Sequence, residues 1–301
     1  MEKLIITVTV DSSMSYPANH LCPPPEMKNI PKIVDEYVRS VNAGASICHI
    51  HGVHKLEDKI AEDGKKLSHV NFEGWKAVHD GIKSKVDCIM QYGIASARFE
   101  EKSKLMDQGP DLMSICFTAH DEHFQPDSNY PPMELYAVHP REELIRYCEE
   151  MKRKRVKVEV ESFTPGAFWN LEYLRSLPGD LLPNPVYTTL FMGWPGGAHT
   201  PPDMESMLNF VHHLPQNCVW NLSNMDPKTH WMNLSWAICL GGHVRVGWED
   251  NPFIDGKLAD TNARLVEKIV RISRELGREI ASPEEGRKII GLPLKRSIHG
   301  S

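Results

Sequence analysis

The chain lacks the features of a nucleic-acid-binding, membrane or disulfide-rich protein. Its 301 residues carry 34 Lys and Arg against 40 Asp and Glu, so no basic excess favours a nucleic acid or an anionic membrane. No apolar run approaches the roughly 18 residues of a membrane span. The seven cysteines are widely spaced and form no CxxC pair, which is typical of free thiols in a reducing compartment. Since the N-terminus also shows no signal peptide, we expect a cytoplasmic protein.

A G-x-G-x-x-G turn is also missing after the first predicted strand, which disfavours a dinucleotide-binding open sheet. Short β-branched runs instead alternate with amphipathic stretches. Strands are expected at 5–11, 46–52, 87–93, 112–118, 156–163, 185–193, 217–224 and 242–250. Helices are expected at 30–43, 72–83, 99–106, 141–154, 167–176, 203–213, 228–240 and 260–276.

This alternation predicts an α/β protein with a (β/α)8 TIM barrel, since that fold repeats eight such units over about 250 residues. We predict a single domain over residues 1–301, with an extension from about 278 to 301. Ser282 followed by Pro283 is typical of a helix start in this extension. The extension is expected to pack on the base of the barrel or on a neighbouring subunit.

Two histidines at the end of the second predicted strand are the strongest chemical signal. His49 and His51 are two residues apart, so they project from the same side of a strand, about 7 Å apart. Glu249 ends the eighth strand, which lies next to the first in a closed barrel. Two imidazoles and a carboxylate suit Zn²⁺ and leave a position open for substrate. A His-x-His pair alone is more often incidental, but the added glutamate favours a metal site.

Charged residues on two further strands are candidates for the same site. Arg245 is expected to point into the barrel, where it needs Asp250 or a substrate carboxylate as a partner. A purely structural ion pair is the alternative. Lys157, Glu159 and Glu161 share one face of the fifth strand, and inward carboxylates are costly unless paired or functional. We predict that Glu159 pairs with Lys157 and that Glu161 lies in the site.

The glycine-rich turn after the sixth strand contains Gly193 and Gly196. These glycines would allow a ligand to approach the backbone closely, with amides free to hold an anion. A plain loop is the alternative. No Ser/His/Asp set is evident, and no cysteine has the surroundings of a nucleophile.

Five segments carry a resemblance to a known family. They are AGASICHIH at 43–51, EVESF at 159–163, MGWPGG at 192–197, GHVRVGWEDN at 242–251 and LGREIASPEEGR at 276–287. On these motifs the chain resembles the β-keto acid cleavage enzyme family, typified by 3-keto-5-aminohexanoate cleavage enzymes. The resemblance implies a zinc-dependent TIM barrel, usually a homotetramer. It also implies a reaction of a β-keto acid with acetyl-CoA that gives acetoacetate and a new acyl-CoA.

The resemblance also implies roles for individual residues. It makes His49, His51 and Glu249 the metal ligands and Arg245, Asp250 and Glu161 catalytic residues. Asp250, held by Arg245, would remove the α-proton of the keto acid.

Two positions depart from the family pattern and are expected to face substrate. Met14 stands where members carry an acid, so a substrate with an amino group is not expected. Gln91 stands in the third strand, where a hydroxyl side chain usually supports the catalytic aspartate.

Three other functions remain open from the sequence: a metal-dependent hydrolase, a CoA-independent lyase and a non-catalytic binder of keto acids. Amidohydrolase-like barrels place His-x-His on the first strand, whereas here it lies on the second. That order counts against a hydrolase.

Overall fold

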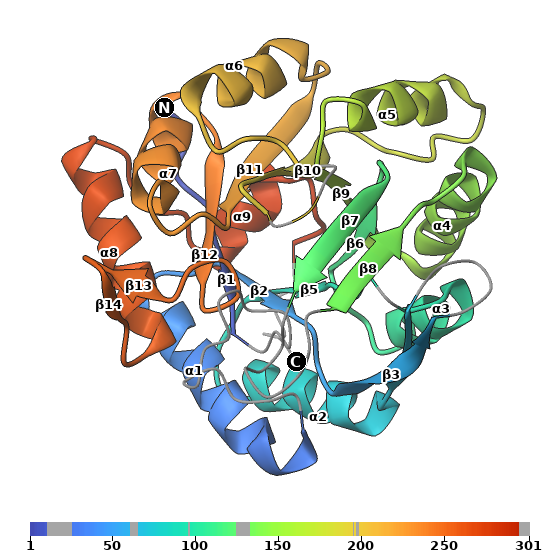
Figure 1. Cartoon of the computed structure of the whole chain (residues 1–301), viewed down its shortest axis with the longest axis horizontal. Helices are drawn as coiled ribbons and strands as arrows, with labels where there is room; N and C mark the ends of the chain where they lie inside the picture. The colour runs from blue at the N-terminus through green and yellow to red at the C-terminus, as the bar shows by residue number, and fades with distance from the viewer. Residues whose placement is uncertain are drawn as a thin grey trace, which may run out of the picture.

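Eight parallel strands close into a barrel in the computed structural model, which describes residues 1–10, 26–60, 66–95, 97–124, 133–194, 196 and 199–294 (Figure 1). The strands are β1 (Ile6–Thr9), β2 (Ile47–Ile50), β5 (Ile89–Tyr92), β6 (Leu112–Cys116), β9 (Lys157–Ser162), β10 (Val186–Met192), β11 (Cys218–Asn224) and β12 (His243–Gly247). Around the wall they follow the order β1-β12-β11-β10-β9-β6-β5-β2. The predicted TIM barrel is confirmed, and each strand lies within its expected range.

Helices surround the barrel and bury their apolar faces against it (Figure 1). They are α1 (Ile30–Ala43), α2 (Phe72–Lys83), α3 (Phe99–Met106), α4 (Arg141–Lys154), α5 (Ala167–Ser176), α6 (Met204–His213), α7 (His230–Cys239) and α8 (Asn262–Glu275), and the 3-10 turn η1 (Met27–Asn29) precedes α1. Helix α6 begins one residue later than expected because Asp203 is its N-cap and accepts the Ser206 amide. The 3.6-residue period of apolar side chains therefore placed these helices correctly.

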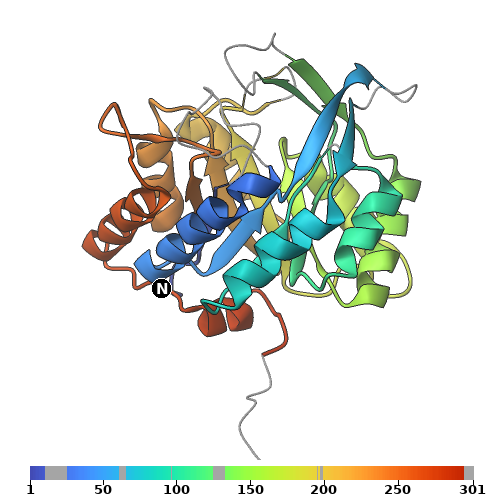
Figure 2. The same ribbon diagram turned by 90° about the horizontal axis from the view of Figure 1, so that it is seen from below.

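Three hairpins that the sequence analysis did not predict follow β2, β6 and β12. They pair β3 (His54–Ile60) with β4 (Lys66–Val70), β7 (His120–Phe124) with β8 (Met133–Ala137), and β13 (Phe253–Ile254) with β14 (Lys257–Leu258). In Figure 2 the first two rise from the barrel on the side opposite α9 (Pro283–Ile289). They therefore extend the end of the barrel where the strands terminate, which is where TIM barrels carry their active sites.

The opposite end of the barrel is closed by α9 (Figure 2). Ala281 and Ile290 flank this helix and pack with apolar side chains from the beginnings of the strands, among them Ile47 and Tyr187. Ser282 caps the helix in a capping box with Glu285. The described part of the C-terminal extension, up to residue 294, thus packs on the barrel base, one of the two expected positions.

An ion pair fastens this extension to the barrel. Arg287, 4% exposed, donates to both carboxylate oxygens of Asp111 at 2.8 and 2.9 Å, and to the Cys88 carbonyl at 3.3 Å. A two-pronged contact of this kind fixes geometry as well as charge.

None of the helices in the described ranges combines the length and apolar character that a membrane span needs. The cysteines in these ranges are all free thiols, as expected.

His243 links β12 to the first strand through a hydrogen bond that only a neutral imidazole can accept. Its Nδ1 accepts the Ile5 amide at 2.9 Å, and the ring is 1% exposed. Burial, reinforced by the charge of Arg278, lowers the pKa of His243 to about 3.

This depressed pKa predicts loss of stability in acid. Between the ordinary value of 6.5 and about 3, the unfolded chain binds a proton at His243 that the folded chain does not. As the pH is lowered through this window, the free energy of unfolding should therefore decrease, by up to about 1.4 kcal/mol per pH unit from this group. Urea unfolding of His243→Gln between pH 7 and pH 4 should show a shallower fall, whereas the exposed His212→Gln should match the wild type. If the free energy of unfolding of His243→Gln depended on pH as steeply as that of the wild type, His243 would not be the source of the acid sensitivity.

Candidate active site

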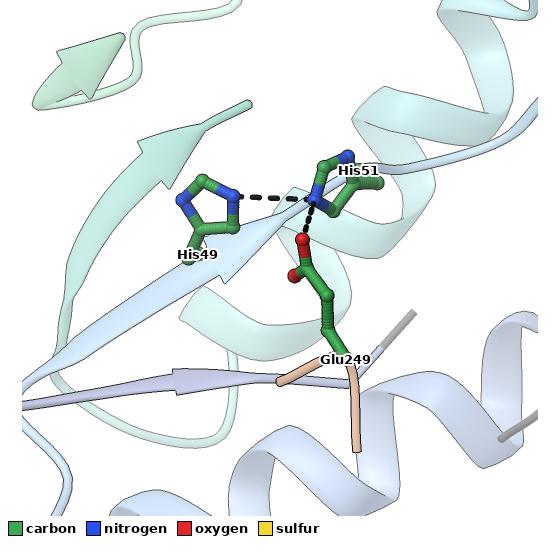
Figure 3. Close-up of side chains that lie close together, drawn as sticks. All are labelled: His49, His51 and Glu249. Carbon is green, nitrogen blue, oxygen red and sulfur yellow. Dashed lines mark hydrogen bonds and ion pairs between the residues drawn. The ribbon is translucent and has the colours of Figure 1, made fainter. Parts of the chain in front are cut away.

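His49, His51 and Glu249 converge at the end of the barrel where the strands terminate (Figure 3). The Nε2 atoms of the two histidines lie 3.2 Å apart, and His51 Nε2 lies 3.0 Å from Glu249 Oε1. All three residues are buried. The alternation of side chains along β2 thus places both imidazoles on one side, as predicted, and the return of β12 to β1 brings in the carboxylate.

This arrangement fits a divalent cation. Ligands around tetrahedral Zn²⁺ at about 2.1 Å stand about 3.4 Å from one another, close to the spacing found here. Glu249 Oε2 is buried and has no hydrogen-bond partner among the described residues, as expected of an oxygen available for coordination. Burial, with the nearby charge of Arg245, lowers the pKa of His49 well below its ordinary value. A neutral imidazole is the form that binds a metal.

Arg245 lies between two carboxylates. It donates to Asp250 through Nε and a terminal nitrogen at 2.7–3.1 Å, and that nitrogen also lies 2.8 Å from Glu249 Oε1. Exposure of Arg245, Glu249 and Asp250 is 2% or less. The predicted partnership of Arg245 with Asp250 is confirmed.

The protonation equilibria of this trio follow from burial and mutual charge. Burial would raise the pKa of Glu249, but Arg245 and then His51 hold it below its ordinary value. For Asp250, burial and the Glu249 charge raise the pKa despite the opposing effect of Arg245. The pKa values of the two neighbouring carboxyl groups are therefore shifted in opposite directions, and Asp250 is the better proton acceptor of the pair.

A tight turn after β12 presents Glu249 and Asp250. The strand ends at Gly247 and not at Asp250 as expected, because the amides of Asp250 and Asn251 both donate to the Gly247 carbonyl. Gly247 has φ +146°, and a Cβ there would lie 2.0 Å from the Thr9 carbonyl oxygen, so no larger residue fits.

A network behind the turn holds its backbone. The Trp248 amide donates to Asn262 Oδ1 at 2.9 Å, and the Asn262 amide donates to Glu36 Oε2 at 2.9 Å. Asn262 also donates to Ser40 at 3.1 Å. Sequence reasoning missed these residues, since nothing local in α1 or α8 indicates that they meet.

Gly93 gives the His49 ring its space. A Cβ at Gly93 would lie 2.3 Å from His49 Cε1 and 2.4 Å from Nε2. Gly93 directly follows β5, which pairs with β2 so that Gln91 lies beside His49. This glycine was not predicted to belong to the site, because its only local signal is its place at a strand end.

A cavity of about 30 Å³ opens at this cluster. It is lined by His49, His51, Gly93, Ile94, Ala95, Glu161, Phe163, Phe191, Trp194, Arg245 and Glu249. Glu161 therefore shares the cavity with the three predicted metal ligands, as expected. Asp250 lies behind the lining, in contact with Arg245.

One expectation about the charged side chains of β9 is wrong. Lys157 does not pair with Glu159: its amine donates to the Pro183 carbonyl at 3.4 Å, because Lys157 begins the strand and its side chain reaches out past the barrel wall. The predicted Lys157–Glu159 ion pair is therefore wrong. Glu159 is fully buried, and burial raises its pKa against the opposing effects of Ser114 and Arg245.

The predicted substrate residues have different positions. Gln91 is buried, donates to Ser114 Oγ at 3.2 Å and interacts with the His49 ring, so it lies next to the site. The Gly193 amide donates to the Thr200 carbonyl at 2.9 Å, so it is not free to hold an anion as expected. Gly196 is exposed, and Met14 lies outside the described residues.

Comparison with known proteins decides the family. The sequence profile described as beta-keto acid cleavage enzyme matches residues 3–292. The chain belongs to the β-keto acid cleavage enzyme family. It is 29% identical over 302 residues to the 3-keto-5-aminohexanoate cleavage enzyme of Acetoanaerobium sticklandii, with 97% of this chain and 99% of the relative covered.

Two further comparisons cover less of the relatives. The 3-dehydrocarnitine:acetyl-CoA trimethylamine transferase of Rhizobium meliloti is 37% identical over 151 residues, 50% of this chain and 48% of the relative. Solved ObcA, in a ternary complex with a C4-CoA adduct and oxalate, aligns at a TM-score of 0.66 and 17% identity. That alignment covers 87% of this chain and 66% of ObcA, and shows a shared fold.

The contact between Gly93 and His49 leads to a test of the candidate metal site. If His49 is a ligand, Gly93→Ala should weaken the binding of added Zn²⁺ about 10- to 100-fold, the range for changes that misplace a metal ligand, because the new methyl group must displace the imidazole. Competition with a chromophoric chelator measures the affinity. Gly166→Ala is the matched control, since its nearest neighbour, Thr164 Oγ1, is 3.2 Å away and belongs to no part of the site. Wild-type affinity in Gly93→Ala would show that His49 is not a ligand.

Proposed function

We propose that this protein is a zinc-dependent β-keto acid cleavage enzyme that uses acetyl-CoA as co-substrate. The observation that carries the proposal is the convergence of His49, His51 and Glu249 beside the Arg245–Asp250 pair, in a chain of this family. Relatives are named for keto acids and acetyl-CoA, including a 3-oxoadipate:acetyl-CoA acetyltransferase that is 26% identical over 273 residues.

The proposed reaction exchanges two acyl groups. The bond between the α-carbon and the keto carbon of R–CO–CH2–COO⁻ breaks, and the R–CO group passes to the sulfur of CoA. The acetyl group of acetyl-CoA passes to the α-carbon and gives acetoacetate. Atoms and charge balance without an oxidant or reductant.

In the proposed mechanism, Asp250 accepts the α-proton. Arg245 holds the carboxylate of Asp250 in a fixed orientation, and burial keeps its pKa raised, which suits a general base near neutral pH. His49, His51 and Glu249 would hold the metal. When bound, Zn²⁺ supplies Lewis-acid stabilisation of negative charge on the substrate oxygens.

Other residues of the cavity would position substrate. Glu161 is the carboxylate on the β9 side, and we propose that it assists proton movement there. Gln91 would orient the His49 ring. The thioester chemistry itself belongs to CoA, and the protein supplies position and charge.

The metal identity, the assembly and the location in the cell are part of the same proposal. Two imidazoles and one carboxylate with a free position support Zn²⁺. Family resemblance supports a homotetramer, and free cysteines support a cytoplasmic location.

The proposal is tested with the zinc-loaded protein and a panel of β-keto acids, with and without acetyl-CoA, analysed by mass spectrometry. Acetoacetate and a new acyl-CoA should appear together and only when acetyl-CoA is present. Consumption of keto acid without acetyl-CoA would instead indicate a hydrolase or a CoA-independent lyase. Saturable binding without any turnover would indicate a non-catalytic relative.

Asp250→Asn separates the base from the metal site. The amide cannot accept the α-proton, so kcat should fall at least about 100-fold, while zinc content stays that of the wild type. Asp203→Asn is the control, since asparagine also caps a helix and Asp203 caps α6. Near-normal turnover of Asp250→Asn would exclude Asp250 as the base.

A further inference from the structure

One wall of the cavity is aromatic. Phe163 follows β9, Phe191 lies in β10 and Trp194 follows β10, and all three line the cavity that His49 and Glu249 also line. With Cys116 and Met225 they form an apolar cluster separate from the two larger cores. We call Phe163, Phe191 and Trp194 the aromatic wall.

The aromatic wall is held in place by its own contacts. The rings of Phe163 and Phe191 stack with centroids 4.3 Å apart and planes inclined by 12°, and Phe163 also stacks on His199 at 5.4 Å. Trp194 donates from Nε1 to Ser223 Oγ at 3.3 Å. A surface fixed before substrate arrives loses little side-chain entropy on binding.

The charges near the aromatic wall disfavour a second cation on it. The Arg245 guanidinium carbon already lies 5.4 Å from the Phe191 ring centroid and 5.9 Å from that of Trp194. Rings of this kind attract cations, but here a resident cation occupies that role. A substrate ammonium group placed against the same rings would meet like charge.

A charged group in R that is an anion finds no available cationic side chain among the described lining residues either. Arg245 is the only Lys or Arg among the described residues that line the cavity, and it is committed to Asp250 and Glu249. Glu161 lines the cavity as well and would repel a further carboxylate. Among the described lining residues, Glu161 is the carboxylate that is not assigned to the metal, and it could attract an amine. A β-keto acid with an amino group in R is therefore the critical comparison.

We propose that the aromatic wall receives an uncharged, apolar R group of the β-keto acid substrate. The proposal rests on the proposed function, because it assigns the substrate class of that site. Burying apolar substituents against the wall should improve binding about fourfold per methylene removed from water, whereas a charged group would lose its hydration without a partner.

Three six-carbon acids that differ in charge test the proposal. The zinc-loaded enzyme and acetyl-CoA are given 3-oxohexanoate, 3-oxoadipate or 5-amino-3-oxohexanoate, and kcat/KM is measured for each. 3-Oxohexanoate, whose R group is uncharged, should have a kcat/KM at least about 10-fold higher than either acid with a charged R group, because the charge on R would have to be desolvated. Equal or higher kcat/KM for either charged acid would overturn the proposal, and a preference for the amine would assign its recognition to Glu161.

Binding measurements separate this proposal from the proposed function. If none of the three acids yields acyl-CoA, the proposed function fails, and titration calorimetry of the same acids still tests the aromatic wall. Tighter binding of 3-oxohexanoate supports the wall's assignment. Tighter binding of a charged acid, or no binding of any acid, overturns it.

Variants of Phe163 provide a second test. Phe163→Gln should raise KM for 3-oxohexanoate about 10-fold and leave kcat nearly unchanged, because the wall binds ground state and transition state alike. Phe163→Leu keeps an apolar surface and should retain the preference for the neutral acid. A change in kcat alone, or an unaltered preference for 3-oxohexanoate in Phe163→Gln, would count against the role of the aromatic wall. If this variant does not fold, the order of kcat/KM for the three acids with the wild-type enzyme decides.

Discussion

The site depends on one buried cation that holds two carboxylates. Arg245 contacts Asp250 and Glu249 inside a barrel that excludes water from all three. A buried arginine is tolerated only with anionic partners, and two partners leave this trio with a net negative charge. That surplus suits a divalent cation bound by the neutral rings of His49 and His51. The proposed metal and the proposed base are therefore electrostatically coupled: a change in either alters the charge that the other experiences.

The fold supplies what this coupling requires. Polar side chains in the middle of a barrel are costly to bury, and the apolar layer below them, closed by α9, offsets part of that cost. The turn after β12 is fixed from outside the barrel by Asn262 and Glu36, so the carboxylates are held by backbone as well as by Arg245. Conformational freedom at Gly247 and open space at Gly93 are equally necessary, since a single added methyl group would meet backbone at one and the His49 ring at the other.

Much of this was predictable because the signals are local. Periods of two and 3.6 residues placed the barrel strands and the surrounding helices, and the same alternation brought His49 and His51 to one side. The parts that were missed depend on contacts between distant segments. Gly93 matters because β5 lies beside β2. Lys157 does not pair with Glu159 because its amine is directed to the Pro183 carbonyl. The hairpins were missed because they are insertions after barrel strands, which the eight-unit pattern does not require.

The proposed metal ligands and the aromatic wall lie on different strands of the same barrel. The proposed metal ligands and base come from β2 and the turn after β12, whereas the aromatic wall comes from β9 and β10, which are not neighbours of β2 or β12 in the barrel. The aromatic wall therefore contributes no side chain to the proposed metal-ligand set. In this chain Arg245 connects the two parts, because the same guanidinium that holds Asp250 faces the rings of Phe191 and Trp194.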